Sequence, residues 1–271
     1  MTQIMDREGD RFRTVWLIGR GKLVDSIAAS LENAKQKAAV LDPDVDWPSD
    51  MGCDLAIAIT REDTNTKRQL IQRMEDRLPD HAIIAVNCES MPLSDVQAGS
   101  RHPSRIVGLN WSFPADLTLF LEIITNDITD AASRVRLEEL ARQKWGKDPY
   151  ISSSGFSLRA RLMAAWAREA IYLVENDYAS MESVDRACRN DAGYYLPFAG
   201  NFRYMDLMGT YAYGTVMKDL NPELSKDTAI SDAIAEAIAA YAPKTSEAKF
   251  RQFSEEILAL ILKNDHETFD S

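Results

Sequence analysis

Short apolar runs alternate with amphipathic runs through the first half of this chain. Apolar runs rich in β-branched residues indicate buried strands at 13–19, 37–42, 53–60, 81–87 and 105–112. Segments with helical spacing lie among them, at 22–36 and 65–78. Because these strands are apolar throughout rather than at alternate positions, helices must cover both faces of the sheet. The pattern predicts an α/β fold with a Rossmann-like, doubly wound and mostly parallel sheet.

The second half of the chain has helical spacing only. Apolar residues recur at helical intervals from residue 154 onward, and further helices are expected at 180–190, 203–219, 228–241 and 246–263. Glycine, proline and a run of serines in "KWGKDPYISSSG" mark a boundary between the two halves. We therefore expect an NAD-binding Rossmann-like domain at 1–148 and an all-α helical domain at 149–271.

Composition excludes several classes of partner. The net charge of −11 disfavours nucleic acid, since binding phosphates needs a surplus of Lys and Arg. The longest apolar runs are too short to span a bilayer, and the N-terminus lacks an apolar signal-peptide core. Cys53, Cys88 and Cys188 stand far apart with no metal-ligand spacing. We expect a cytoplasmic protein without a membrane segment, a metal or a nucleic-acid partner.

A glycine-rich turn follows the first predicted strand. The segment Gly19-Arg20-Gly21-Lys22-Leu23-Val24 is a G-x-G-x-x-V version of the dinucleotide fingerprint, with valine in place of the third glycine. Asp42 ends the second strand 23 residues after Gly19, where an acid accepts hydrogen bonds from the ribose 2′-hydroxyl and repels a 2′-phosphate. The pattern favours NAD over NADP. Arg20 and Lys22 complicate that choice because either could meet a phosphate, and a Rossmann-shaped domain without nucleotide is the alternative.

A polar pair lies in the stretch "RIVGLNWSFPADLTLFLEII". Asn110 stands near the end of a predicted strand, and Glu122 follows twelve residues later. The side chain that most often transfers protons in active sites is histidine, whereas an asparagine amide does not titrate near neutral pH. Asn110 could orient a substrate or be a satisfied polar group. Glu122 could act as a base if burial raised its pKa, or could have a structural role.

Several segments, in order and over nearly the whole length, resemble the 3-hydroxyacyl-CoA dehydrogenase family. They are "CDLAIAITREDTNTKRQLI", "AVNCESMPLSDV", "HPSRIVGLNWSFPADLTLFLEII", "SGFSLRARLMAAWAREAIYLVE" and "AGNFRYMDLMGTYAYGTVMKDL". The resemblance places a Glu-x-x-x-x-Lys pair at Glu62 and Lys67, and puts Asn87 in the region of the nicotinamide and the substrate. The cofactor contacts expected on this basis are Gly19, Arg20, Gly21, Lys22, Leu23, Asp42, Ile59, Glu62, Lys67 and Asn87.

The resemblance also implies a mechanism from which this chain departs. In the family a histidine takes the proton of the substrate hydroxyl, a glutamate orients it, and an asparagine of the helical domain holds the substrate. Only the glutamate is kept, as Glu122. The histidine position is Asn110, the asparagine falls at Arg159 or Ala160, and a serine near the nicotinamide becomes Glu89. The segment between Asp42 and the next strand is also too short for the family's coenzyme A-binding excursion.

Two functions remain open at this stage. The first is an NAD-dependent oxidoreductase that acts on a small 3-hydroxy acid or acyl derivative with an altered proton relay, for which Glu122, Asn110 and Asn87 are the candidate catalytic residues. The alternative is a repurposed scaffold with non-redox chemistry or nucleotide binding without turnover. The resemblance implies a homodimer through the helical domain. A tyrosine cluster there, which includes Tyr194, Tyr195, Tyr204, Tyr211 and Tyr213, is expected to serve packing rather than a substrate cleft.

Overall fold

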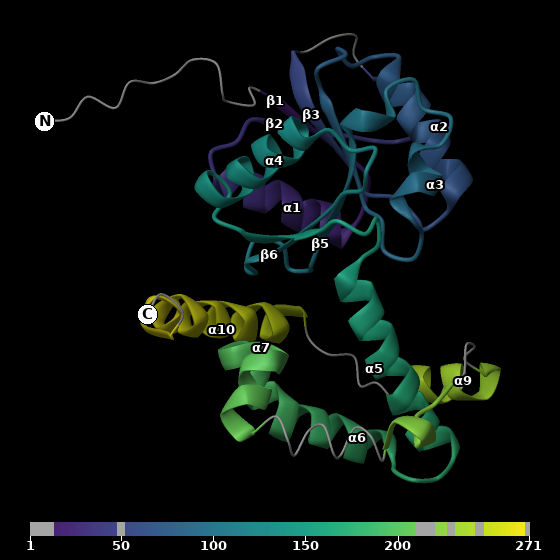
Figure 1. Ribbon diagram of the computed structural model, residues 1–271, viewed down its shortest axis with the longest axis vertical. Coiled ribbons are helices and arrows are strands. Elements are labelled where there is room, and N and C mark those ends of the chain that lie inside the picture. The colour runs from purple at the N-terminus through teal and green to yellow at the C-terminus, as the bar shows by residue number, and fades with distance from the viewer. Residues whose placement is uncertain (1–13, 48–51, 210–219, 227–230, 242–246, 269–271) are drawn as a thin grey trace, which may run out of the picture. The chain divides into compact units, whose positions relative to one another are not determined.

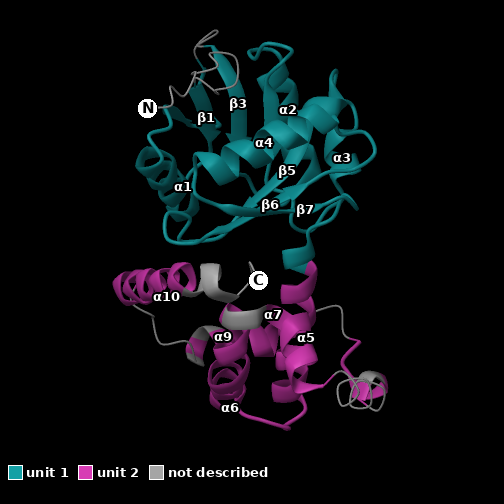
Figure 2. Cartoon of the chain, turned by 60° about the vertical axis from the view of Figure 1, so that its left-hand side comes forward, with its two compact units in different colours: residues 1–160 teal, residues 161–271 magenta. Residues whose placement is uncertain are grey.

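The computed structural model describes residues 14–47, 52–209, 220–226, 231–241 and 247–268. The chain divides into two compact units, Met1–Ala160 and Arg161–Ser271 (Figure 2). The first unit holds a sheet with helices, and the second is helical, as predicted (Figure 1). The sheet runs past the boundary expected at 148, because its last strand continues to Ser152.

Seven strands form one sheet in the order β2-β1-β3-β4-β5-β6-β7. Their bounds are β1 Thr14–Ile18, β2 Ala38–Leu41, β3 Cys53–Ala58, β4 Ile83–Val86, β5 Ile106–Trp111, β6 Phe120–Ile124 and β7 Asp148–Ser152. Neighbouring strands are parallel except for β5 and β6. The predicted Rossmann-like, mostly parallel sheet is therefore confirmed.

Helices cover the sheet on both faces. Their bounds are α1 Lys22–Asn33, α2 Thr64–Glu75, α3 Leu93–Gln97 and α4 Ala131–Gln143. Successive residues of β1 point to opposite faces. Val15 and Leu17 join a core that includes residues of α1 and α4, while Trp16 and Ile18 join a second core with residues of α2 and α3. This burial on both sides explains why the strands are apolar throughout.

Acidic side chains start two of these helices. Asp63 accepts the Thr66 N–H at 2.7 Å at the beginning of α2, and Asp130 accepts the Ser133 N–H at 2.8 Å at the beginning of α4. Helix α1 instead has Gly21 as its N-cap residue, so that no side chain caps the first turn. The backbone N–H groups of that turn thus remain available to a ligand.

The second unit contains most of the remaining helices. The helical elements of this half are α5 Leu158–Glu175, α6 Met181–Ala187, a π-helical turn Cys188–Ala192, α7 Gly193–Met208, a 3-10 turn Asn221–Glu223, α9 Asp232–Tyr241 and α10 Glu247–Thr268. Part of the helix expected at 203–219 lies outside the described residues. No helix in the described part of the chain has the length and apolar character needed to cross a bilayer.

Few side chains of the second unit are buried. Among its described residues only Ala192, Ser225 and Ile234 fall in the buried class. Large apolar side chains such as Leu162 and Phe253 are 73% and 59% exposed. Large apolar side chains of the described helices are therefore open to solvent.

Candidate active site

The turn after β1 is shaped for a dinucleotide. Gly19 has φ 151°, and a Cβ there would lie 2.7 Å from the carbonyl oxygen of Ile59 and 2.9 Å from Val24 Cγ2. Only glycine fits this approach of β1 to β3. Gly21 has φ 94°, and a Cβ there would meet nothing within 4 Å. The space above the uncapped first turn of α1 is thus open, as pyrophosphate binding requires.

Two aspartates hold Arg20 at the end of β2. Arg20 Nε donates to Asp42 Oδ2 at 2.9 Å, and Arg20 Nη2 pairs with both Asp42 and Asp44. The backbone N–H of Asp44 also donates to Asp42 Oδ1 at 2.8 Å. The Arg20 guanidinium, followed by this N–H, lowers the pKa of the Asp42 carboxyl. The arginine that could have met a 2′-phosphate is engaged by two acids.

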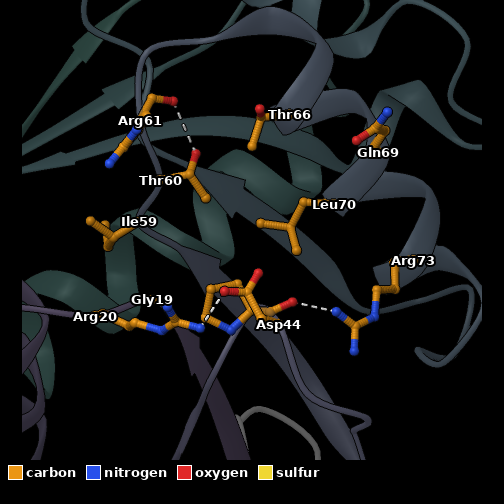
Figure 3. A pocket seen from close by; sticks show the side chains of 11 residues that line it. Gly19, Arg20, Asp44, Ile59, Thr60, Arg61, Thr66, Gln69, Leu70 and Arg73 are labelled. Carbon is orange, nitrogen blue, oxygen red and sulfur yellow. Dashed lines mark hydrogen bonds and ion pairs between the residues drawn. The ribbon is translucent and has the colours of Figure 1, made fainter.

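A cavity of about 680 Å³ opens beside Arg20 and its two aspartate partners. Its lining residues are Gly19, Arg20, Pro43, Asp44, Ile59, Thr60, Arg61, Thr66, Gln69, Leu70 and Arg73. Figure 3 shows Arg20, Asp44 and Arg73 along one edge, with Thr60 and Thr66 along the other. Arg73 binds the carbonyls of Pro43 and Val45, which fixes the loop after β2.

The cavity and the turn together fit NAD. Of the predicted cofactor contacts, Gly19, Arg20 and Ile59 line the cavity. Gly21 is the N-cap of α1 and Lys22 its first residue, where backbone N–H groups would receive the pyrophosphate. The Leu23 side chain instead packs against the core of the sheet. In the usual binding mode of this fold, the adenosine ribose would lie at the carboxylate of Asp42, next to the cavity-lining Pro43 and Asp44.

A second polar network joins the ends of β3 and β4. Lys67 is buried, and its Nζ lies 2.9 Å from Asn87 Oδ1 and 3.1 Å from Glu62 Oε1. Asn87 Nδ2 donates to Glu62 Oε1 and to the Thr60 carbonyl, each at 2.9 Å. Burial lowers the pKa of Lys67, and the Glu62 carboxylate opposes that effect. The network brings together the three residues that the resemblance had pointed to and holds the loop that borders the cavity.

Asn110 is buried and uses both ends of its amide. Its Oδ1 accepts the Cys88 N–H at 2.8 Å, while its Nδ2 donates to the Cys88 carbonyl at 3.1 Å and to Glu122 Oε2 at 2.8 Å. Both N–H groups of the amide are thereby engaged. Of the two interpretations drawn from the sequence, this geometry is that of a satisfied polar group.

Glu122 lies on β6 and is fully buried next to the beginning of α5. Oε1 accepts the backbone N–H groups of Leu158 and Arg159 at 2.7 and 3.1 Å, and Oε2 accepts the Ser157 hydroxyl at 2.6 Å. The carboxylate thus receives three hydrogen bonds from residues at, or directly before, the N-terminus of this helix. Burial, followed by the adjacent Glu122 charge, raises the pKa of the Tyr150 hydroxyl.

An ion pair lies beside this cluster. Arg159 Nη1 lies 2.9 Å from Glu89 Oε1, and the Arg159 guanidinium lies 5.4 Å from the centre of the Phe120 ring. Both charged residues were expected departures from the family, but their pairing was not predicted. Ser157, whose hydroxyl accepts the Ala160 N–H at 2.9 Å, was not predicted either. A serine directly before a helical apolar run was the available signal.

The tyrosine cluster of the second unit is only partly described. The rings of Tyr195 and Tyr204 stack with centroids 3.8 Å apart. Tyr194 is 79% exposed. Tyr211 and Tyr213 lie outside the described residues. Stacking of Tyr195 on Tyr204 is a packing contact, the role that the sequence favoured.

Two family profiles match consecutive parts of the chain. Residues 14–153 match "3-hydroxyacyl-CoA dehydrogenase, NAD binding domain", and residues 155–254 match "3-hydroxyacyl-CoA dehydrogenase, C-terminal domain". The chain belongs to the 3-hydroxyacyl-CoA dehydrogenase family. The predicted family and its cofactor, NAD, are thereby confirmed.

Curated members of the 3-hydroxyacyl-CoA dehydrogenase family are similar over part of their length. The 5-formyl-3-hydroxy-2-methylpyridine 4-carboxylate 5-dehydrogenase of Mesorhizobium japonicum is 27% identical over 202 residues, which cover 73% of this chain and 62% of the relative. A 3-hydroxybutyryl-CoA dehydrogenase of Mycobacterium tuberculosis is 32% identical over 158 residues, or 57% of this chain and 54% of the relative. The chain thus spans less than two thirds of either relative.

Solved structures of the 3-hydroxyacyl-CoA dehydrogenase family share the fold. A crystal structure of a 5-formyl-3-hydroxy-2-methylpyridine 4-carboxylic acid 5-dehydrogenase matches with a TM-score of 0.79 at 21% identity, and covers 95% of this chain and 99% of that one. A 3-hydroxyacyl-CoA dehydrogenase from Archaeoglobus fulgidus matches with a TM-score of 0.70 at 21% identity, with coverages of 93% and 98%. The sheet and the helical unit are those of the family.

Proposed function

We propose that this chain is an NAD-dependent oxidoreductase that acts on a small 3-hydroxy acid or acyl derivative, with a proton relay that bypasses residue 110. The open, uncapped turn at Gly21 beside the cavity of about 680 Å³ is the observation that carries the proposal. The names of the relatives support it, since both are dehydrogenases of small hydroxylated or acyl compounds. NAD supplies the hydride chemistry when bound.

In this proposal the three candidate catalytic residues position the site and carry no proton. Asn110 cannot titrate, and both N–H groups of its amide are already engaged. Glu122 is fully buried beneath the start of α5, out of reach of a substrate hydroxyl. Asn87 is bound to Thr60, Glu62 and Lys67. The proton of the substrate hydroxyl therefore passes to a solvent-facing group or to water.

A second candidate function is nucleotide binding without turnover. The saturated Asn110–Glu122 cluster favours it, because losing one general acid–base group costs about 100- to 10,000-fold in rate. Positioning of the cofactor against the substrate retains the rest of the rate enhancement. The two candidates differ in turnover and share the cofactor site.

Titration with NADH, followed by tryptophan fluorescence, tests the cofactor site. Gly21→Asp would place a carboxylate in the anion cradle and should abolish binding. Gly146→Asp is the matched control, because Gly146 also has a positive φ, 63°, with open space around it. A wild-type protein without saturable binding of NADH overturns the oxidoreductase proposal. Binding without nicotinamide reduction, across a panel of 3-hydroxy acids and CoA thioesters, leaves the second candidate.

We also propose a cytoplasmic homodimer formed through the helical unit. The exposed apolar side chains of α5 and α10, such as Leu162, Trp166 and Phe253, support it, and a second copy is the partner that would cover them on every molecule. The three free cysteines fit a reducing compartment. Light scattering should give twice the chain mass. Phe253→Glu should shift it toward the monomer, whereas a wild-type monomer at micromolar concentration overturns the proposal.

A further inference from the structure

The Glu89–Arg159 ion pair closes a ring of contacts around the buried cluster. Glu89 follows Cys88, whose peptide is held by Asn110. Asn110 binds Glu122, and Glu122 accepts the backbone N–H of Arg159. The Arg159 side chain then returns to Glu89 at 2.9 Å. The positions of both charged residues are thus set by hydrogen bonds to buried groups.

The guanidinium at the rim of this ring is preorganised. The Arg159 backbone is fixed by Glu122, and its side chain is braced by Glu89 and by the Phe120 ring at 5.4 Å. The Arg159 side chain is 31% exposed, so that it lies partly out of water but within reach of a ligand. A charged group held in this way loses little conformational freedom on binding and interacts more strongly than one in bulk solvent.

The Arg159 guanidinium also has N–H donors beyond the one that binds Glu89. Within the described part of the chain its side chain donates one hydrogen bond, from Nη1 to Glu89. The Nε and Nη2 edge of the guanidinium presents the parallel N–H pair that matches the two oxygens of a carboxylate. A neutral thioester carbonyl does not need this parallel pair of N–H donors. A free carboxylate group is the ligand chemistry that this arrangement recognises.

We propose that Arg159 is the receptor for a substrate carboxylate, and that the substrate is a free hydroxy acid rather than a thioester. The inference rests on the proposed function and narrows its substrate class. Glu89 positions the guanidinium and also offsets part of its positive charge. The two residues therefore have opposite effects on acid binding: Arg159 attracts the carboxylate, and Glu89 weakens that attraction.

The test measures binding of 3-hydroxybutyrate and of its uncharged methyl ester by calorimetry, with and without saturating NADH. The wild type should prefer the acid. Arg159→Gln should weaken acid binding by about 10- to 100-fold, as expected for the loss of charge-assisted hydrogen bonds, and leave the ester unchanged. Glu89→Gln should strengthen acid binding about threefold or more by removing a like charge. The matched control is Arg168→Gln, which removes an exposed arginine of α5.

The outcomes separate this inference from the proposal on which it rests. Equal acid binding by the wild type and Arg159→Gln, a preference for the ester, or no acid binding by a protein that binds NADH overturns the inference alone. Absence of NADH binding overturns the proposed function, and acid binding without NADH then still tests Arg159. Circular dichroism and NADH affinity of the Arg159 and Glu89 variants should match the wild type, which excludes a folding defect as the cause.

Discussion

Asn110 and Glu122 face each other across β5 and β6, the one antiparallel pair among the described strands, with the amide nitrogen 2.8 Å from the carboxylate. The same carboxylate receives the first N–H groups of α5. One buried carboxyl group therefore joins the sheet to the beginning of a helix. A contact of this kind stabilises the site and, in the proposed function, takes no part in proton transfer.

Asn110→Asp should destabilise the protein in a pH-dependent way. Two carboxyl groups would then meet in a buried site, and the pKa of the pair would rise above that in the unfolded chain. A raised pKa in the folded state gives stability that is present at low pH and lost as the pH rises through it. We expect a loss on the order of 3 kcal/mol at pH 8 and a smaller loss at pH 5 in urea unfolding. A loss of stability that does not depend on pH would contradict the contact between residues 110 and 122.

Glu122→Gln should lower the free energy of unfolding by about 2–4 kcal/mol, because one N–H group of the glutamine would face donors rather than acceptors. Urea unfolding at neutral pH measures this. Glu32→Gln, an exposed position on α1, is the matched control and should change little. A Glu122 variant with native stability but no turnover would instead identify this carboxylate as a base.

The double variant Asp42→Asn with Asp44→Asn should bind NADPH more tightly. In the wild type both acids engage Arg20 and would repel a 2′-phosphate. Their removal leaves the guanidinium to pair with that phosphate, which we expect to raise NADPH affinity by about 10- to 100-fold. NADH affinity should fall as the Asp42 contact to the ribose is lost. Fluorescence titration with both cofactors measures the change.

A control for this exchange lies on the same loop. Asp46 is exposed, and Asp46→Asn removes one negative charge, compared with two in the double variant. An equal gain in NADPH affinity from this variant would show a general charge effect rather than the release of Arg20.

Lys147 should make stability depend on pH above neutrality. Its ammonium is buried against the carbonyls of Ala115 and Thr118, and burial lowers its pKa to about 8. Because the unfolded value is near 10.5, the unfolded chain binds more protons between these values, and stability rises with pH over this window. Lys147→Met should remove that rise, which urea unfolding at pH 8 and pH 10 detects. The exposed Lys37→Met is the control, and an equal effect there would contradict the assignment.

Local patterns sufficed for the first five strands and for the nucleotide turn. Gly19, Gly21 and Asp42 stand at the spacing of the dinucleotide fingerprint. A strand that is buried on both faces is visible in the sequence as a continuous apolar run. Strand β6 was not predicted because Glu122 interrupts its apolar run, and β7 was not predicted because Asp148 and Pro149 stand within it.

The ring of contacts around Asn110 could not be read from the chain. Glu89 and Arg159 are 70 positions apart, and Glu122 reaches its helix partners across 35 to 37 positions. Such pairs follow from the order of strands in the sheet, which no single segment encodes. The resemblance identified Glu89, Asn110 and Arg159 as departures from the family, without showing that they meet around Glu122.

The two hydrogen bonds between Asn110 and the Cys88 peptide constrain which residue can replace the asparagine. An imidazole at position 110 could not accept the Cys88 N–H while donating to both the Cys88 carbonyl and Glu122, since it has two ring nitrogens for three partners. A single Asn110→His substitution would leave a buried main-chain group without its hydrogen-bond partner. Installing the histidine that the family resemblance expects at this position therefore takes more than one substitution.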